Sequence, residues 1–158
     1  YSDDDAWDMI GNLEKRGSVE KDNYAMGLLI RSTGGFAGLL RASFQHADKL
    51  LTIRARTDQE AIQSAAQKLE IEDNVRQECI TLLRGLNQEE VNLMYDISEG
   101  DVDWNSPVLG DLVNKQLLKR TTVHPGLEVR PHILAEHIRR NPTRPKAKGP
   151  KRPVTLPN

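Results

Sequence analysis

The stretch Arg31–Arg41, which reads RSTGGFAGLLR, decides the fold because it ends one apolar helical segment and begins another. Gly34 and Gly35 can adopt positive φ at little steric cost, as the end of a helix often requires. The apolar crowding upstream predicts a helix over residues 19–31 that is buried nearly all round. Downstream, apolar residues recur at helical spacing at Phe36, Leu40, Phe44, Ala47 and Leu51. We therefore expect a tight corner between two helices.

The remainder of residues 1–84 carries the caps and the spacing of further helices. Acidic, cap-forming residues precede a first helix over residues 6–13. Thr57 and Glu60 have the spacing of a capping box, which predicts that a helix begins there. A further helix is expected over residues 73–84, with Cys79 on its apolar face. Residues 1–84 are thus predicted to form an all-α, lid-like bundle.

The second part, residues 85–140, changes character. The sequence predicts a helix capped at 87, a helix over 106–116, strands over 117–123 and 127–130 joined by a turn at 124–126, and a helix over 133–138. This is the order of a winged-helix domain with a two-stranded wing. The remaining residues, 141–158, are basic and rich in proline, so we expect a flexible tail that is disordered or extended. The predicted fold class is therefore mainly α.

Composition narrows the classes of function. The chain has 158 residues with a formal net charge of −1, so no global field favours nucleic acid or a membrane. Hydrophobic residues make up 37% and aromatic residues 4%, which favours helices packed through aliphatic side chains. Cys79 is the sole cysteine, which excludes an internal disulfide and favours a reducing compartment. We expect a cytoplasmic protein without membrane contact, and further sequence upstream of Tyr1.

Three motifs carry a resemblance to a known family. Residues 33–40, TGGFAGLL, resemble the lid of AAA+-related P-loop ATPases, especially the STAND class and the origin-recognition initiators. Residues 112–118, LVNKQLL, resemble the Leu-x-x-x-Gly-Leu-Leu segment of their winged-helix domain, with Gln116 in place of glycine. Residues 132–138, HILAEHI, resemble the final helix of that domain. The resemblance covers roughly residues 19–140.

The resemblance implies that the chain is a non-catalytic, C-terminal regulatory module of such an ATPase, which relays nucleotide state to a protein or nucleic-acid partner. It assigns Gly34, Gly35 and Arg41 to cofactor binding, with Arg41 as the nucleotide sensor. Relatives carry Pro and sometimes a sensing Arg where this chain has Ala37 and Gly38. Walker A and Walker B motifs do not occur in this sequence, so it is not expected to be an enzyme by itself. ATP and Mg²⁺ would bind in an N-terminal ATPase domain, which would be the module's first partner.

Four basic residues of the second part are candidates for nucleic-acid contact: Lys115, Lys119, Arg120 and Arg130. Together with the tail they predict weak, salt-sensitive and non-specific contact with phosphates. The predicted recognition helix contains Asp111 and offers no arginine for guanine, so sequence-specific recognition is disfavoured. A protein-contact or structural role for this part is favoured over both.

Other interpretations stay open. The corner at Gly34 is interpreted first as a site of close helix packing and second as a nucleotide-dependent hinge. An alternative function is a free-standing winged-helix DNA-binding protein with a helical dimerisation domain, and a third is a structural adaptor. His132 and His137 are five residues apart and so do not share a helix face well enough for a zinc pair, and no metal ligand set is predicted. No activated nucleophile is recognised either.

Overall fold

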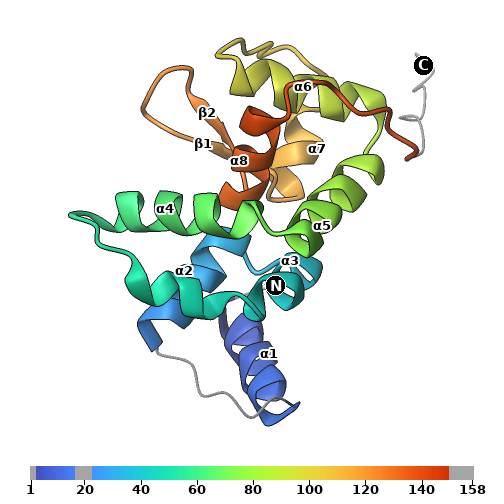
Figure 1. Ribbon diagram of the computed structural model, residues 1–158. Helices are drawn as coiled ribbons and strands as arrows, with labels where there is room; N and C mark the ends of the chain where they lie inside the picture. Colours follow the sequence, from blue (N-terminus) through green and yellow to red (C-terminus); the bar gives the residue numbers. More distant parts are fainter. Residues whose placement is uncertain (1–2, 17–22, 150–158) are drawn as a thin grey trace.

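The computed structural model describes residues 3–16 and 23–149, and the fold is mainly helical with a small antiparallel sheet (Figure 1). In chain order the elements are α1 (Asp3–Arg16), α2 (Asn23–Thr33), α3 (Ala37–Phe44), the 3₁₀ helix η1 (Ala47–Thr52), α4 (Asp58–Glu70), α5 (Asp73–Arg84), α6 (Gln88–Ser98), α7 (Leu109–Asn114), β1 (Leu118–Arg120), β2 (Leu127–Val129) and α8 (His132–Arg140). Helix α1 extends beyond the predicted range 6–13 at both ends, and the predicted start of the second helix, residue 19, lies outside the described residues.

The corner between α2 and α3 is where the sequence predicts it. Gly34 and Gly35 have φ values of 62° and 73°, in the left-handed region that favours glycine. The hydroxyl of Thr33 donates to the carbonyl of Leu29 at 2.9 Å and so completes the last turn of α2. A Cβ atom on Gly34 would lie 3.1 Å from Cβ of Pro131, which is tighter than ordinary contact. The corner therefore packs closely against the start of α8.

The helix after the corner is shorter than its apolar spacing predicts. The expected continuous helix is wrong beyond Phe44, where α3 ends. Ala47 and Leu50 of the predicted stripe are still buried, in η1, whereas Leu51 is 48% exposed. In a continuing α-helix the carbonyl of Ala42 would accept from the amide of His46. Instead it accepts from the side chain of Asn74 at 2.8 Å, while the His46 amide turns to the carbonyl of Ser43.

Of the capping box predicted at Thr57 and Glu60 only one half forms, whereas the cap predicted at residue 87 is a complete capping box. At α6, Asn87 Oδ1 accepts from the Glu90 amide at 2.8 Å and Glu90 Oε1 accepts from the Asn87 amide at 3.1 Å. At α4, Thr57 Oγ1 accepts from the Glu60 amide at 3.2 Å. The Glu60 carboxylate, however, accepts from the amide of Arg56. Both helices therefore begin where their caps predict.

The region from residue 106 to residue 130 is more compact than predicted. α7 begins at Leu109 because Ser106 and the following proline form a turn, in which the Ser106 carbonyl accepts from the Leu109 amide. The strands are three residues each, with Lys119 opposite Glu128 in an antiparallel pair. They are shorter than expected because the loop closes early. The Thr121 amide donates to the carbonyl of Gly126 at 3.0 Å.

Helix α8 lies at the centre of the molecule, between α4 and α6 (Figure 1). It also packs against α2 and α5, so residues on both sides of position 84 surround it. Its side chains Ile133, Leu134 and Ile138 are buried in a core that runs through both parts. The two predicted units, 1–84 and 85–140, therefore share one apolar core.

Residues 141–149 differ from the flexible tail that the sequence predicts. They lie along α6 after the chain leaves α8 (Figure 1), and backbone amides of this segment donate to α5, to the α5–α6 corner and to α6. The segment is extended, as composition suggests, but it is anchored because partners on α5 and α6 satisfy its hydrogen-bonding groups. Residues 150–158 lie outside the described part.

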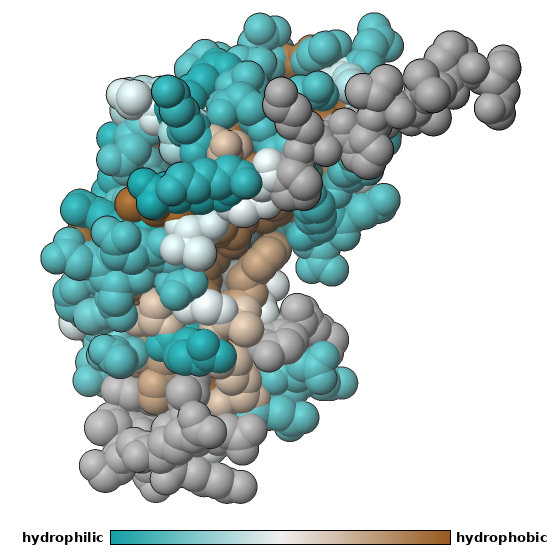
Figure 2. All heavy atoms as spheres, turned by 90° about the vertical axis from the view of Figure 1, so that its right-hand side faces the viewer, coloured by the Kyte–Doolittle hydropathy of each residue, from teal (hydrophilic) through white to brown (hydrophobic). Residues whose placement is uncertain are grey.

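The surface is mostly hydrophilic on the side seen in Figure 2, where hydrophobic atoms appear in a band across the middle. Large apolar side chains that remain exposed are scattered over several elements: Trp7, Tyr24, Leu51, Ile71, Trp104 and Val123. Within residues 3–16 and 23–149, every helix is too short or too polar to cross a membrane.

Candidate functional site

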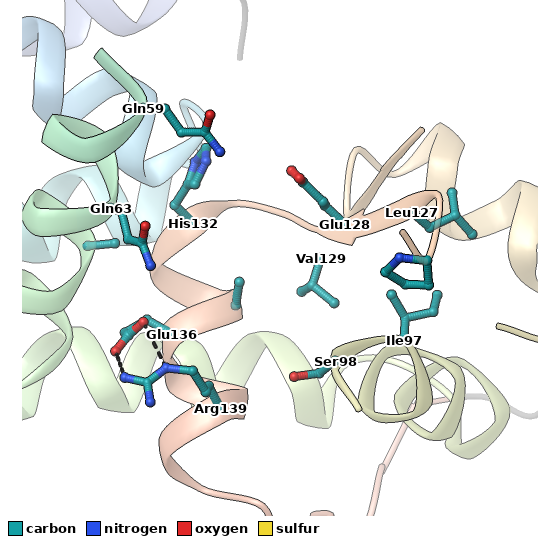
Figure 3. A pocket seen from close by; sticks show the side chains of 13 residues that line it. Gln59, Gln63, Ile97, Ser98, Leu127, Glu128, Val129, His132, Glu136 and Arg139 are labelled. Atoms are coloured by element: carbon teal, nitrogen blue, oxygen red, sulfur yellow. Dashed lines mark hydrogen bonds and ion pairs between the residues drawn. The ribbon is translucent and has the colours of Figure 1, made fainter. Parts of the chain in front are cut away.

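Two cavities meet at the start of α8 and share His132 as a wall. The first, here called the corner cavity, has a volume of about 270 Å³ and is lined by Arg31, Gly34, Phe36, Val113, Gln116, Leu118, Lys119, Arg130, Pro131 and His132. The second, here called the α4 groove, has a volume of about 340 Å³. Its walls come from α4, α6, β2 and α8 (Figure 3).

The corner cavity is basic. Arg31 reaches it from the end of α2, Lys119 from β1 and Arg130 from the residue after β2. None of its lining residues is acidic. These cations are brought together because Gly34 allows α2 to end directly against Pro131. An opening of this size with three cationic side chains suits an anion such as a phosphate group.

His132 connects the cations of the corner cavity. Its pKa is lowered, first by burial and then by the charge of Arg130, and a hydrogen bond to the backbone of Arg31 opposes these effects. Arg130 Nη1 lies 3.4 Å from His132 Nδ1. Because a guanidinium only donates, Nδ1 must accept in a neutral imidazole, which leaves Nε2–H for the carbonyl of Arg31. His132 therefore links the end of α2 to Arg130, the residue after β2.

The guanidinium of Arg130 uses only some of its hydrogen-bond donors within the described residues. Its Nη2 lies 2.9 Å from Glu128 Oε2, which neutralises one charge of the cluster. Its Nε atom is buried and has no hydrogen-bond partner among the described residues. A buried donor without an acceptor costs roughly 1–3 kcal/mol. Arg130 thus retains a donor for an acceptor that the described residues do not supply.

The predicted cofactor residues separate in the structure. Gly34 lines the corner cavity and Gly35 is buried beside it. Arg41 is exposed on α3 and does not line the cavity. Gly38 lies against α5, where an added Cβ would collide with the carboxylate of Glu78. Arg31, not Arg41, is the arginine of the quoted stretch that reaches the cavity.

The predicted nucleic-acid residues also separate. Lys119 and Arg130 line the corner cavity, whereas Arg120 is exposed on β1 outside it. Lys115 is bound to the buried carboxylate of Glu90, with Nζ 2.7 Å from Oε2. Its charge is therefore largely neutralised and serves to hold α7 on α6.

Sequence reasoning missed Arg31 and the role of His132. Arg31 lies in the corner stretch 31–41 and His132 in the motif of the last helix, residues 132–138. Neither motif contains a sequence pattern that is known to bind anions. The cavity is made by residues that are distant in sequence and adjacent only because α8 packs on α2. No local sequence pattern could have predicted that these residues line one cavity.

The α4 groove has one side that is mainly polar and one that is mainly apolar (Figure 3). Gln59 and Gln63 face it from α4, while Ile97 and Val129 line the opposite wall. The carboxylate of Glu136 at its edge is bound by Arg139 and by Arg140. The groove is the larger of these two cavities, yet its two acids, Glu128 and Glu136, are already paired with arginines, so it offers less chemistry than the corner cavity.

A buried ionic cluster lies behind α8. Glu70 has no exposed surface, and its carboxylate lies 3.2 Å from His137 Nδ1, 3.0 Å from Arg140 Nη1 and 3.7 Å from Arg76 Nε. The cluster joins α4, α5 and α8. Because the buried carboxylate of Glu70 is already paired with side chains of this chain, two of them partly exposed arginines, we interpret the cluster as structural.

Cys79 is not a nucleophile in this fold. Its side chain has no exposed surface. Burial, and to a lesser degree the charges of Glu70 and Glu78, raise the pKa of its thiol to about 12. A reactive cysteine needs the opposite shift, because the thiolate is the attacking species.

Comparisons with known proteins give no relative: no family model, no curated protein and no solved structure matches the chain. Among the described residues, no group of three or more His, Cys, Asp or Glu side chains could hold a metal ion. The function must therefore be argued from the geometry of the cavities.

Proposed function

We propose that the chain is the C-terminal regulatory module of a P-loop ATPase of the AAA+ or STAND type, and that its corner cavity receives a phosphate group of the nucleotide. The observation that carries the proposal is the corner cavity itself. Arg31, Lys119 and Arg130 converge there without an acidic residue in the lining. The nucleotide would be held by an upstream ATPase domain, to which this module adds cations.

The backbone at Gln116 supports the assignment of residues 85–140 as a winged-helix domain. Its φ is 63°, a conformation that glycine adopts at little cost. This is the position at which the resembling families carry glycine. The antiparallel hairpin of β1 and β2, which follows α7 and precedes α8, has the place of a wing.

The relay would run through His132. It connects the carbonyl of Arg31 at the end of α2 with Arg130, and Arg130 connects with Glu128 on β2. A phosphate group that attracts Arg130 would weaken this chain of contacts and reorient the hairpin relative to α2. Nucleotide state would thereby change the surface that the hairpin offers to a partner.

Protonation of His132 should be coupled to anion binding. The pKa of His132 lies below its ordinary value of 6.5, so the folded state favours the neutral ring. The stability from this group is present above pH 6.5 and is lost as the pH falls through the folded pKa. A bound phosphate would favour the imidazolium and raise this pKa.

The experiment is an NMR titration of the His132 ring over pH, with the full chain alone and then with inorganic phosphate, ADP or ATP. We expect each anion to raise the pKa of His132, with a larger effect for a nucleotide if the upstream domain is present. Lys119→Ala should weaken anion binding about tenfold, as expected for a charge-assisted hydrogen bond. Arg120→Ala is the matched control, because Arg120 is the neighbouring cation outside the cavity. Equal losses for both variants, or an unchanged His132 pKa, would contradict the proposal.

Extending the reading frame upstream tests the family assignment independently of the cavity. A P-loop ATPase requires a Walker A loop to cradle the phosphates. Its presence before Tyr1 is the expected result. An upstream sequence without it removes the ATPase assignment, whatever the cavity binds.

A second function, non-specific contact with nucleic-acid phosphates, is favoured by Lys119 and Arg120, which are exposed next to each other on β1. The same two variants distinguish it. Nucleic-acid binding would weaken with Arg120→Ala as much as with Lys119→Ala and would fall steeply with salt. Nucleotide binding would respond to Lys119→Ala alone.

A further inference from the structure

One face of α6 forms hydrogen bonds with the backbone of residues 141–149. The side-chain amide of Gln88 acts at two points: Nε2 donates to the carbonyl of Pro145 at 3.3 Å, and Oε1 accepts from the amide of Ala147 at 3.0 Å. A paired contact of this kind reads an extended main chain independently of its side chains. The α6 face therefore has the chemistry of a peptide-binding surface.

The end of the segment is bound by carbonyls at the end of α5 and just after it. The amide of Lys148 donates to the carbonyl of Arg84 at 2.9 Å, and the amide of Gly149 donates to the carbonyl of Leu86 at 3.1 Å. A helix leaves carbonyls of this kind without partners of its own. A Cβ atom at Gly149 would collide with the backbone oxygens of Gly85 and Leu86. Only glycine fits at this position of the segment.

One side chain of the segment is recognised in detail. The guanidinium of Arg144 lies 2.5 Å from Asp96, 3.6 Å from Glu99 and 3.4 Å from the carbonyl of Asn92, and its centre is 5.8 Å from the centre of the Tyr95 ring. A planar guanidinium can bind carboxylate, carbonyl and ring at once, which an ammonium group cannot. The position thus selects arginine and not merely positive charge.

Two prolines restrict the backbone of the segment to conformations that suit an extended chain on this surface. Pro142 and Pro145 fix φ in the extended range and carry no N–H group that would need an acceptor. The phenol of Tyr95 donates to the carbonyl of Asn141 at 3.2 Å, just before the first proline. The recognised pattern is accordingly Pro-x-Arg-Pro-x-x-x-Gly over residues 142–149.

We propose that the α6 face, formed by Gln88, Asn92, Tyr95, Asp96 and Glu99 with the end of α5, is a docking surface for an extended Pro-x-Arg-Pro-x-x-x-Gly peptide of a partner protein, and that residues 141–149 occupy it as a built-in competitor. Charge complementarity supports this occupant, since the segment is basic and the face presents two carboxylates to its arginine. A tethered competitor has a high effective concentration, so a free peptide binds well only when the segment is weakened. The proposal goes beyond the proposed function, because it does not involve the corner cavity.

The test uses the full chain with Arg144→Ala and a fluorescent nine-residue peptide with the sequence of residues 141–149. Hydrogen exchange first reports release: the amides of Ala147, Lys148 and Gly149 should exchange at least about tenfold faster in the variant, as their hydrogen bonds open more often. Fluorescence anisotropy should then give peptide binding to the variant at least about tenfold tighter than to the unmodified chain, because the tethered competitor is weakened. Lys146→Ala, which removes an exposed cation of the same segment, is the matched control and should change neither readout.

Peptide variants test the recognition itself. A peptide with lysine at the position of Arg144 keeps the charge but loses the contacts of the planar guanidinium. A peptide with alanine at the position of Gly149 keeps the length but carries a Cβ atom that does not fit against the end of α5. Both should bind the Arg144→Ala chain at least about tenfold more weakly than the original peptide. Adding Gln88→Ala to that chain should abolish binding. The proposal is overturned if the variant peptides bind as well as the original. It is also overturned if exchange shows the segment released but no peptide binds, or if Arg144→Ala leaves the amides protected.

Discussion

Gln116 shows how much strain one residue stores in this fold. With φ at 63° it occupies the left-handed region, where a side chain costs roughly 1–2 kcal/mol relative to ordinary backbone. Gln116→Gly should relieve that strain and stabilise the protein by about 0.5–1 kcal/mol after the larger entropy of the unfolded glycine is subtracted. The measurement is the urea midpoint at unchanged slope. Gln116→Ala keeps the strain and should not stabilise, so a similar gain in both variants would contradict this explanation.

Cys79 offers a second test at the residue scale. Its thiol has a pKa raised to about 12 and no exposed surface, so a thiol reagent at pH 8 should label it only as fast as the protein unfolds. Because the folded pKa is raised, the neutral thiol contributes stability below pH 9.0 that is lost as the pH rises toward about 12. If the thiol of the folded chain were labelled as fast as that of the chain unfolded in denaturant, this explanation would be contradicted, because α5 would then open locally.

At the scale of single elements, Glu90 serves two helices at once. One oxygen completes the capping box of α6, and the other binds Lys115 at the end of α7, while the carboxylate is 2% exposed. Glu90→Gln retains an acceptor for the cap and loses the ionic contact, so we expect a loss of about 1 kcal/mol. Glu90→Ala loses both contacts and should cost about 2 kcal/mol or more. Thermal unfolding of the two variants measures the difference, and equal losses would mean that the cap contributes nothing.

The elements also show what local sequence can and cannot predict. The capped starts of α4 and α6 follow from residues within one turn, and the bounds of α5 agree with the expected 73–84. The end of α3 does not follow, because it depends on Asn74, which is distant in sequence and reaches the carbonyl of Ala42. Apolar spacing alone continues through such a point. Prediction therefore fails where a side chain from another helix takes the place of a backbone donor.

On the scale of the whole molecule, the candidate site follows the same logic. Gly34, Lys119 and Arg130 could be selected from the sequence, since turn chemistry and charge are local properties. Their meeting in one cavity could not be predicted, because it requires α8 to pack against α2. Arg41 was selected by resemblance, yet it lies on the exposed side of α3. The packing of α8 thus decides which of the candidate residues can act together.

Glu70 links α4 to α8 by ionic contacts in the interior of the molecule. It is fully buried on α4 and binds His137 and Arg140 of α8, so removing its carboxylate takes away the buried partner of His137 and leaves Arg140 paired with Glu136 alone. Glu70→Ala should cost about 3–5 kcal/mol. Glu72→Ala is the control, since Glu72 forms partly exposed pairs with Lys49 and His46 and should cost no more than about 1 kcal/mol.

The same variant decides whether residues 1–84 and 85–140 unfold as one. Trp7 on α1 and Trp104 beside the hairpin report from opposite ends of the molecule, and single-tryptophan versions of the chain separate their fluorescence. Because α8 shares its core with both parts, Glu70→Ala should lower the unfolding midpoint of both signals by the same amount. If only the Trp7 signal shifted, the helical bundle would be destabilised while residues 85–140 stayed folded around α8. That result would mean that residues 1–84 and 85–140 unfold as two independent domains. The relay through His132 would then require that the contact between His132 and Arg31 persist when the two parts unfold independently.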